Sequence, residues 1–170
     1  VDWESTGDAN VLSKGLNNLL KSLREEMNKR QDKGGSNYLL TVAIPARSTD
    51  ITPDKFDFVT INKYVDYINM MSYELQNNNM TTHGSALYSS SNDNGYGYSV
   101  DLGVQLFTKY GLNKNKIIIG VSGFGKTYKL TENSNNSNYP GLGVAGYKTK
   151  LPNANGAYAS GTVFLVAIDT

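Results

Sequence analysis

The first long hydrophobic pattern in the chain has the period of a helix. Apolar residues recur at spacings of three and four, at Leu12, Leu16, Leu19, Leu20, Leu23 and Met27. Charged and polar side chains fill most of the remaining positions, so the pattern predicts an amphipathic helix. Asp8 or Asn10 can cap the start of this helix, and we expect it to end near Arg30.

Continuous apolar runs predict strands that are buried on both faces. The three clearest runs are "YLLTVAIPA" (38–46), "VDYINMMSYEL" (65–75) and "KIIIGVSGFG" (116–125). Residues 1–4 resemble the end of an earlier strand, and residues 162–170 are a candidate for a later one. Runs of this kind are typical of a parallel sheet that is covered on both sides.

Shorter helices and long loops separate these runs. We expect one helix over residues 54–64 and another that Ser99 caps and Gly111 ends. The segments 76–98 and 126–162 have no clear periodicity and are predicted to be irregular. Strands and helices thus alternate along the chain, which favours an α/β fold with a parallel sheet.

The composition excludes several classes of function. Sixteen basic and fifteen acidic residues nearly cancel, so charge gives no reason to expect binding to nucleic acid or to an anionic membrane. No apolar run approaches the ~20 residues that a transmembrane helix needs. The absence of cysteine excludes disulfides, thiolate nucleophiles and thiolate metal sites.

The opening "VDWE" places two carboxylates two residues apart. On a strand, Asp2 and Glu4 share one face, while Trp3 points to the other. Two carboxylates held close together repel each other when both are ionised, so one tends to keep its proton and can act as a general acid. The alternative is an ordinary solvated pair at the end of a strand.

A second group of candidate residues ends the run at 65–75. Met71 and Tyr73 share one face of the predicted strand, and Glu74 follows at its carboxyl end. A phenol and a third carboxyl group are then expected at the same end of the sheet as Glu4. The alternative is that Met71 and Tyr73 belong to the core and that Glu74 faces solvent.

Five segments in order resemble glycoside hydrolase family 18, the chitinase family. The opening "VDWE" is similar to the end of its D-x-x-D-x-D-x-E motif, and "MSYE" (71–74) is similar to its M-x-Y-D motif. The other matching segments are "LTVAIPA" (40–46), "TTHGSALY" (81–88) and "YSVDLGVQLFTKYGLNKNKIIIGVSGFGKTYKL" (98–130). Each motif is weak alone, and their common order and spacing carry the resemblance.

The resemblance implies a particular fold. Residues 1–130 would form strands four to seven of a (β/α)8 TIM barrel, and residues 131–170 would begin the small α+β insertion that follows strand seven in many members. A whole barrel takes ~250 residues, so we expect the chain to be an excised piece that lacks the rest of the barrel. Such a piece is expected to be unstable or to self-associate, and to be inactive alone.

The resemblance also implies an activity, namely retaining hydrolysis of β-1,4 bonds in chitin or N-acetylglucosamine oligosaccharides. The substrate's own acetamido group is the nucleophile in this family. Glu4 would be the general acid and base, Asp2 would orient the acetamido N–H, and Tyr73 would donate to the acetamido oxygen. Met71, Glu74 and Arg47 would contact substrate. The implied enzyme uses no metal or cofactor, and the substrate implies secretion.

Several positions depart from the family pattern. Glu4 is followed by Ser5-Thr6-Gly7, where chitinases often have an aromatic residue, Pro and Gly. Glu74 stands where Asp is usual, Lys126 replaces Arg, and Phe124 replaces Tyr. A displacement of ~1 Å at a catalytic group can lower a rate ~100-fold, so these changes imply a divergent member and bear on its efficiency. Two alternatives to a chitinase are open, the first because it uses the same acid and acetamido chemistry and the second because of the change at Glu74. One is an endo-β-N-acetylglucosaminidase, and the other is a catalytically impaired chitin-binding lectin. Arg47 can equally be a solvated or ion-paired charge.

Overall fold

The computed structural model describes most of the chain, in two compact units. The described residues are 1–4, 6–76, 79–91, 98–132, 140–149 and 162–164. The first unit comprises Val1–Ser72 with Asp101–Gly120, and the second comprises Tyr73–Val100 with Val121–Thr170. The predicted domain boundary at residue 130 stays a prediction.

The first unit contains a parallel sheet in the order β1-β2-β3. These strands are Thr41–Pro45, Tyr67–Met71 and Ile117–Ile119. Residues 1–4 extend the sheet beyond β1, because Asp2 forms a parallel bridge with Ala43 and the Ala43 N–H donates to the Val1 carbonyl at 2.8 Å. The prediction of an α/β fold with a parallel sheet is therefore confirmed.

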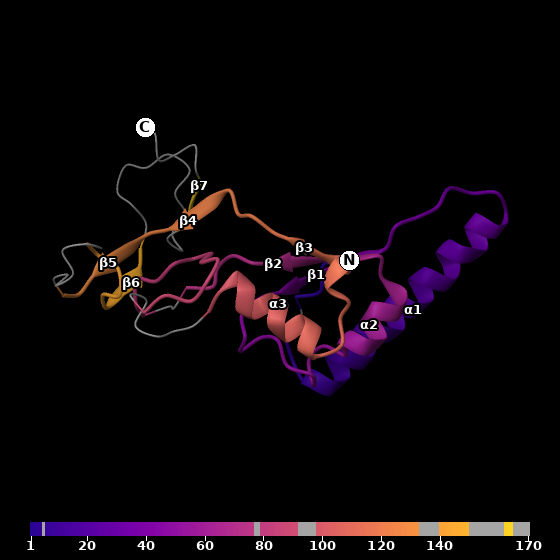
Figure 1. The fold of residues 1–170 in the computed structure, drawn as a ribbon, viewed down its shortest axis with the longest axis horizontal. Coiled ribbons are helices and arrows are strands. Elements are labelled where there is room, and N and C mark those ends of the chain that lie inside the picture. The colour runs from indigo at the N-terminus through magenta and orange to yellow at the C-terminus, as the bar shows by residue number, and fades with distance from the viewer. Residues whose placement is uncertain (5, 77–78, 92–97, 133–139, 150–161, 165–170) are drawn as a thin grey trace. The chain divides into compact units, whose positions relative to one another are not determined.

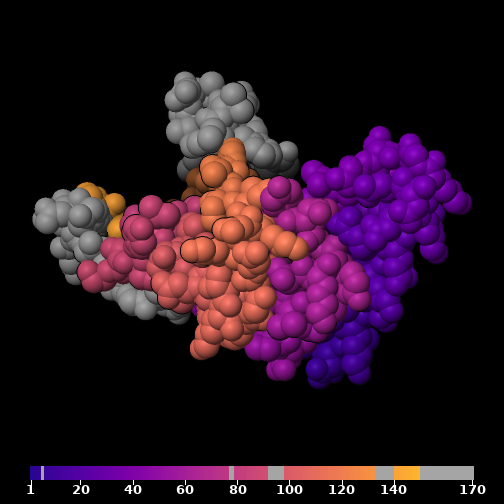
Figure 2. Space-filling view, turned by 45° about the vertical axis from the view of Figure 1, so that its right-hand side comes forward, coloured from indigo at the N-terminus to yellow at the C-terminus, as the bar shows by residue number. Residues whose placement is uncertain are grey.

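Three α-helices lie on one side of this sheet (Figure 1). They are α1 (Ala9–Asp32), α2 (Phe58–Tyr64) and α3 (Val100–Lys109). Asp8 caps α1 through the N–H of Val11, as predicted. The predicted start of α2 at residue 54 was wrong, because Asp57 is its cap. The end of α1 and the loop after it, violet in Figure 2, are exposed throughout residues 31–39.

The strands are buried on one face only, which corrects the expectation of two buried faces. Val42, Ile44 and Met70 are fully buried. In β2, Tyr67 and Asn69 alternate with these core positions and are exposed. Hydrophobicity marked these residues as strand formers, but burial depends on what packs against each face.

The predicted strand at 116–125 was also wrong in length and burial. A short 3-10 helix, η2 (Lys114–Lys116), leads into β3, which ends at Ile119. Ile118 and Ile119 are 45% and 46% exposed. Within the described residues β3 lies at the edge of its sheet, so it pairs with β2 alone.

Hydrogen bonds from charged side chains connect the helices with the amino ends of the strands. Asp66, just before β2, accepts hydrogen bonds from the Leu40 N–H at 2.7 Å and from the Arg24 guanidinium at 2.5 Å. Arg24, from α1, also donates to the Tyr64 carbonyl at 2.8 Å. Lys116 donates to two backbone carbonyls at the end of α2, each at 2.7 Å. These contacts join the helices to the sheet, so we expect them to contribute to stability.

The second unit contains two antiparallel strand pairs, which corrects the irregular segment expected over 126–162. The strand β4 (Phe124–Lys126) pairs with β7 (Thr162–Phe164), and β5 (Tyr128–Leu130) pairs with β6 (Gly146–Lys148). Strands of three residues are too short to show a hydrophobic period. Residues 165–170, expected to continue β7, lie outside the described residues.

The end of α3 provides a test of the fold. Gly111 has a φ of 105°, and a Cβ at this position would lie 2.6 Å from Cγ2 of Val59. Gly111→Ala is therefore expected to lower the free energy of unfolding by about 2 kcal/mol, through backbone strain and steric overlap. Urea unfolding measures this change.

Gly123→Ala is the matched control, because a Cβ there meets no atom within 4 Å. We expect this variant to be at least as stable as the unsubstituted chain. Equal stability of the two alanine variants would contradict the steric explanation for Gly111.

Candidate functional site

The structure places the predicted acid at the carboxyl end of the parallel sheet. Asp2 is level with Ala43 in β1, and Pro45 at the end of β1 is level with Met71 at the end of β2. Glu4 follows Asp2 by two residues and so lies at this same end of the sheet. Both carboxylates are exposed.

Glu4 and Arg47 line one pocket of about 520 Å³ in the first unit. The residues around it are Trp3, Glu4, Thr6, Gly7, Ala9, Leu12, Pro45, Arg47, Asp50, Lys55 and Phe56. Arg47 donates from Nε to the Asp50 carboxylate at 2.8 Å. Arg47 is therefore ion-paired and also lines the pocket that holds Glu4, and its contact with substrate stays a prediction.

The indole of Trp3 lies against α1. A Cβ added at Gly15, in the second turn of that helix, would lie 3.5 Å and 3.6 Å from two carbons of the Trp3 ring. The half-buried Trp3 thus points toward the helix, as expected for the residue between two exposed carboxylates on a strand.

The chain turns immediately after β2. The prediction that Tyr73 and Glu74 belong to this strand was therefore wrong. β2 ends at Met71, and the Ser72 N–H donates back to the Met70 carbonyl at 2.8 Å. Glu74 then adopts a φ of 56°, in the left-handed region that non-glycine residues seldom occupy. Such backbone conformations are concentrated at functional sites.

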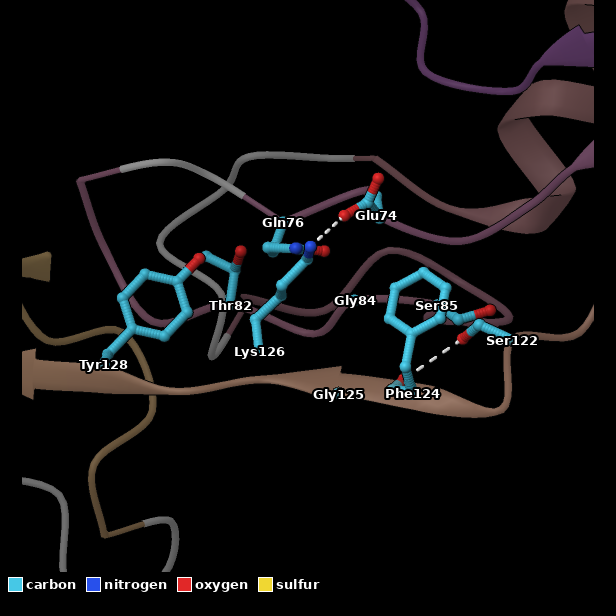
Figure 3. Close-up of a pocket in the computed structure, with 10 residues that line it drawn as sticks. All are labelled: Glu74, Gln76, Thr82, Gly84, Ser85, Ser122, Phe124, Gly125, Lys126 and Tyr128. Atoms are coloured by element: carbon cyan, nitrogen blue, oxygen red, sulfur yellow. Dashed lines mark hydrogen bonds and ion pairs between the residues drawn. The ribbon is translucent and has the colours of Figure 1, made fainter. Parts of the chain in front are cut away.

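Glu74 lines a separate pocket of about 270 Å³ in the second unit (Figure 3). The lining residues are Glu74, Gln76, Thr82, Gly84, Ser85, Ser122, Phe124, Gly125, Lys126 and Tyr128. Lys126 forms an ion pair with Glu74, and its Nζ also lies 5.2 Å from the centre of the Phe124 ring. Glu74 is also exposed, as the alternative interpretation of its position expects, so it faces solvent and is ion-paired at the same time.

Aromatic and hydroxyl groups complete this second-unit pocket. Tyr73 packs edge-on against Phe124, with ring centres 5.9 Å apart. Burial, together with the negative charge of Glu74, raises the pKa of the Tyr128 phenol. That phenol therefore stays protonated and can donate a hydrogen bond over the ordinary range of pH. A ring face beside hydroxyls, an amide and an ion pair is chemistry suited to a polar ligand with apolar faces, such as a sugar.

Gln76 provides a second test of the structure. Its side chain is 4% exposed, and its Oε1 has no hydrogen-bond partner among the described residues. A buried polar atom without a partner lowers stability, so we expect Gln76→Leu to raise the free energy of unfolding by about 1 kcal/mol. Thermal or urea unfolding measures this. Gln31→Leu, the same change at an exposed position of α1, should leave stability nearly unchanged.

The structure thus groups the predicted residues into two sets. Asp2, Glu4, Arg47 and Met71 belong to the first unit. Tyr73 and Glu74 belong to the second. The roles assigned to all six stay predictions.

Sequence reasoning missed part of the second-unit pocket. Gln76, Thr82, Ser122 and Tyr128 were not singled out, because amide and hydroxyl residues are common in loops and have no spacing that marks them. Phe124 and Lys126 did carry a signal, since they occupy positions that the family resemblance distinguishes.

No group of three or more His, Asp or Glu side chains among the described residues is placed to hold a metal ion. No helix in the same part of the chain is both long and apolar enough to cross a membrane.

Comparison with known proteins identifies the chain's relatives. The family model "Glycosyl hydrolases family 18" matches residues 1–164. Chitinase 1 of Aphanocladium album is 30% identical over 156 residues, which are 89% of this chain and 36% of that protein. Mouse chitotriosidase-1 is 28% identical over 147 residues, covering 80% of this chain and 31% of that protein.

Solved structures match at the level of the fold. The group IV chitinase of Ostrinia furnacalis, determined in complex with allosamidin, aligns with a TM-score of 0.77 and 27% identity. The alignment covers 99% of this chain and 45% of that structure. The chain therefore spans less than half of this structure and about a third of the two curated relatives.

Proposed function

The chain belongs to glycosyl hydrolase family 18, and from this premise we propose that it carries the catalytic acid of a retaining chitinase. The proposed reaction hydrolyses β-1,4 bonds between N-acetylglucosamine units. The attacking group is the acetamido oxygen of the sugar on the non-reducing side of the bond, so no enzyme carboxylate bonds to the sugar.

We further propose that the parallel sheet supplies strands four to seven of a (β/α)8 barrel. In this assignment residues 1–4 end strand four, β1 is strand five, β2 is strand six and β3 is strand seven. A TIM barrel places its catalytic groups at the carboxyl ends of its strands.

The proposed roles follow from the chemistry of each group. Glu4 protonates the glycosidic oxygen as the acetamido oxygen attacks the anomeric carbon, and later removes a proton from the incoming water. Asp2 accepts a hydrogen bond from the acetamido N–H and stabilises the positive oxazolinium ion. Tyr73 donates its phenol hydrogen to the acetamido oxygen.

One observation supports this proposal above the others. The parallel bridge between Asp2 and Ala43 puts the "DWE" segment in register with β1, so Glu4 lies at the same end of the sheet as Pro45 and Met71. A solvated carboxylate pair at the opposite end of the sheet would not suit a barrel enzyme. Glu4 also lines a pocket, and a substrate requires one.

The test is substrate comparison with the full-length protein. A fluorogenic chitotrioside and an N-linked glycan are each incubated with the protein, and released product is followed. Turnover of the chitotrioside supports a chitinase, whereas turnover of the glycan alone assigns an endo-β-N-acetylglucosaminidase. Binding of chitin oligosaccharides without turnover assigns a lectin, and neither binding nor turnover contradicts the family function altogether.

A further inference from the structure

We propose that Trp3 and Gly15 form a brace that positions Glu4 for catalysis. The brace is the packing of the Trp3 indole beside α1 at Gly15, where a Cβ would lie at contact distance from the ring. This inference rests on the proposed function, because it assumes that Glu4 is the acid. Trp3 also lines the pocket that holds Glu4. The proposed role acts through the packing of Trp3 against α1, so Trp3 and Gly15 are positioning residues in this proposal.

The first observation is a glycine within a long helix. Gly15 lies inside α1, where glycine is a poor helix former compared with alanine. A Cβ at this position would lie 3.5 Å and 3.6 Å from Cζ2 and Cη2 of Trp3. The helix thus has no side chain where the indole lies. A methyl group here would already touch the ring, which leaves little room for a longer side chain.

The second observation is that Trp3 is the only residue between the sheet and the acid. Asp2 is fixed by its bridge to Ala43, and Glu4 follows Trp3 directly. Glu4 itself is exposed, and among the described residues it has no strand pairing of its own to hold it. The packing of Trp3 against α1 therefore restrains the backbone directly before Glu4.

The two observations together predict a movement. An indole displaced from α1 carries the backbone of Glu4 with it, because the two residues are adjacent. A displacement of ~1 Å at a catalytic group lowers a rate ~100-fold. Substrate binding elsewhere along the sugar chain is not affected by this movement, so the effect should fall on kcat rather than on KM.

A graded series of substitutions at residue 15 tests the brace in the full-length protein. Gly15→Ala places a methyl group at ordinary contact distance from the ring, so kcat should stay within about twofold of the unsubstituted enzyme. Gly15→Leu displaces the ring, and kcat should fall ~100-fold, with KM changing less than about threefold.

A double substitution separates positioning from simple instability. Trp3→Ala lowers kcat by itself, and it also frees the space that a leucine side chain on this turn of α1 requires. The combination of Gly15→Leu with Trp3→Ala should therefore be no slower than Trp3→Ala alone, so the two effects are not additive. Full additivity, or a Gly15→Leu variant with lowered melting temperature and unchanged kcat, overturns the proposal.

The fluorescence of Trp3 tests the brace without any measurement of catalysis. Trp3 is the only tryptophan in the sequence, so the fluorescence of the 170-residue chain reports on its surroundings. Gly15→Leu should shift the emission to longer wavelength, and Gly15→Ala should not. Absence of chitin turnover in the unsubstituted protein refutes the function. Identical emission from all three chains, each with helical circular dichroism that shows it is folded, refutes the brace.

Discussion

Glu4→Gln is expected to lower the kcat for chitotrioside hydrolysis about 1,000-fold. The amide keeps the size and most of the polarity of the carboxyl group, but it cannot give a proton to the leaving oxygen or take one from water. General acid–base catalysis contributes ~100- to 10,000-fold, and in this proposal a single group acts in both steps. KM should change little, because the amide still fills the same space. Steady-state kinetics of the full-length protein measure both constants.

The matched control for this variant is Glu25→Gln. Glu25 is an exposed residue of α1, and its Oε1 lies 3.9 Å from Nζ of Lys21. It is several turns away from the pocket residues at the start of this helix. Its substitution should leave kcat unchanged. If Glu4→Gln kept more than a tenth of the activity, Glu4 would not be the catalytic acid. Another residue of the protein would then have to act as the acid.

Asp66→Asn is expected to lower the free energy of unfolding by about 2 kcal/mol. Asp66 accepts hydrogen bonds from the Leu40 N–H and from Arg24, and it is only partly exposed. Hydrogen bonds that involve a charged group are worth about 1.5–3 kcal/mol each, and solvent around this pair reduces the sum. The Asn side chain retains one acceptor but leaves the Arg24 guanidinium without its counter-charge. Equilibrium urea unfolding at neutral pH measures the loss, and Asp54→Asn at an exposed position is the control.

The same residue predicts how stability depends on pH. Burial alone would raise the pKa of Asp66, but hydrogen bonds from Leu40 and Arg24 and the charges of Arg24 and Lys116 outweigh it, so the pKa falls below the ordinary value of 3.8. A lowered pKa in the folded state means that the stabilisation is fully present above the unfolded-state value. It is lost as pH falls through the folded value.

The unsubstituted protein should therefore lose stability below about pH 4, and Asp66→Asn should lose less over the same range. Asp66→Asn should still lose some stability at low pH, because Asp57 also has a lowered pKa. Burial acts to raise its pKa as well, but hydrogen bonds from Thr60 and Asn17 lower it overall. Equal pH dependence in the two proteins would show that the Asp66 contacts do not form in solution.

The order of the elements in the first unit could be predicted from the sequence because each has a strong local signal. Asp8 provides a cap and the Leu periodicity a helix, and the runs containing Val42 and Met70 lie where β1 and β2 form. The exposure of Ile118 could not be predicted, because a hydrophobic run does not reveal whether anything packs against it. The strand pairs of the second unit were missed because three-residue strands have no period.

The candidate site could be predicted only where chemistry coincides with a motif. Asp2 and Glu4 were identified by their spacing, and the structure adds the register that locates them at one end of the sheet. The ion pair of Glu74 with Lys126 was not foreseen, although both residues had been noted as departures from the family pattern. Two residues so far apart along the chain show no relation in a single sequence, and only the fold brings their side chains together.

The left-handed backbone at Glu74 restricts how this position can change during evolution. Asp and Asn adopt that conformation more readily than Glu, so Glu74→Asp would relieve strain. The shorter side chain would also withdraw the carboxylate from Lys126. A longer cationic side chain at position 126, such as Arg, would restore the ion pair with the shorter carboxylate. Positions 74 and 126 are therefore expected to co-vary among descendants of this sequence, with Glu accompanying Lys and Asp accompanying Arg.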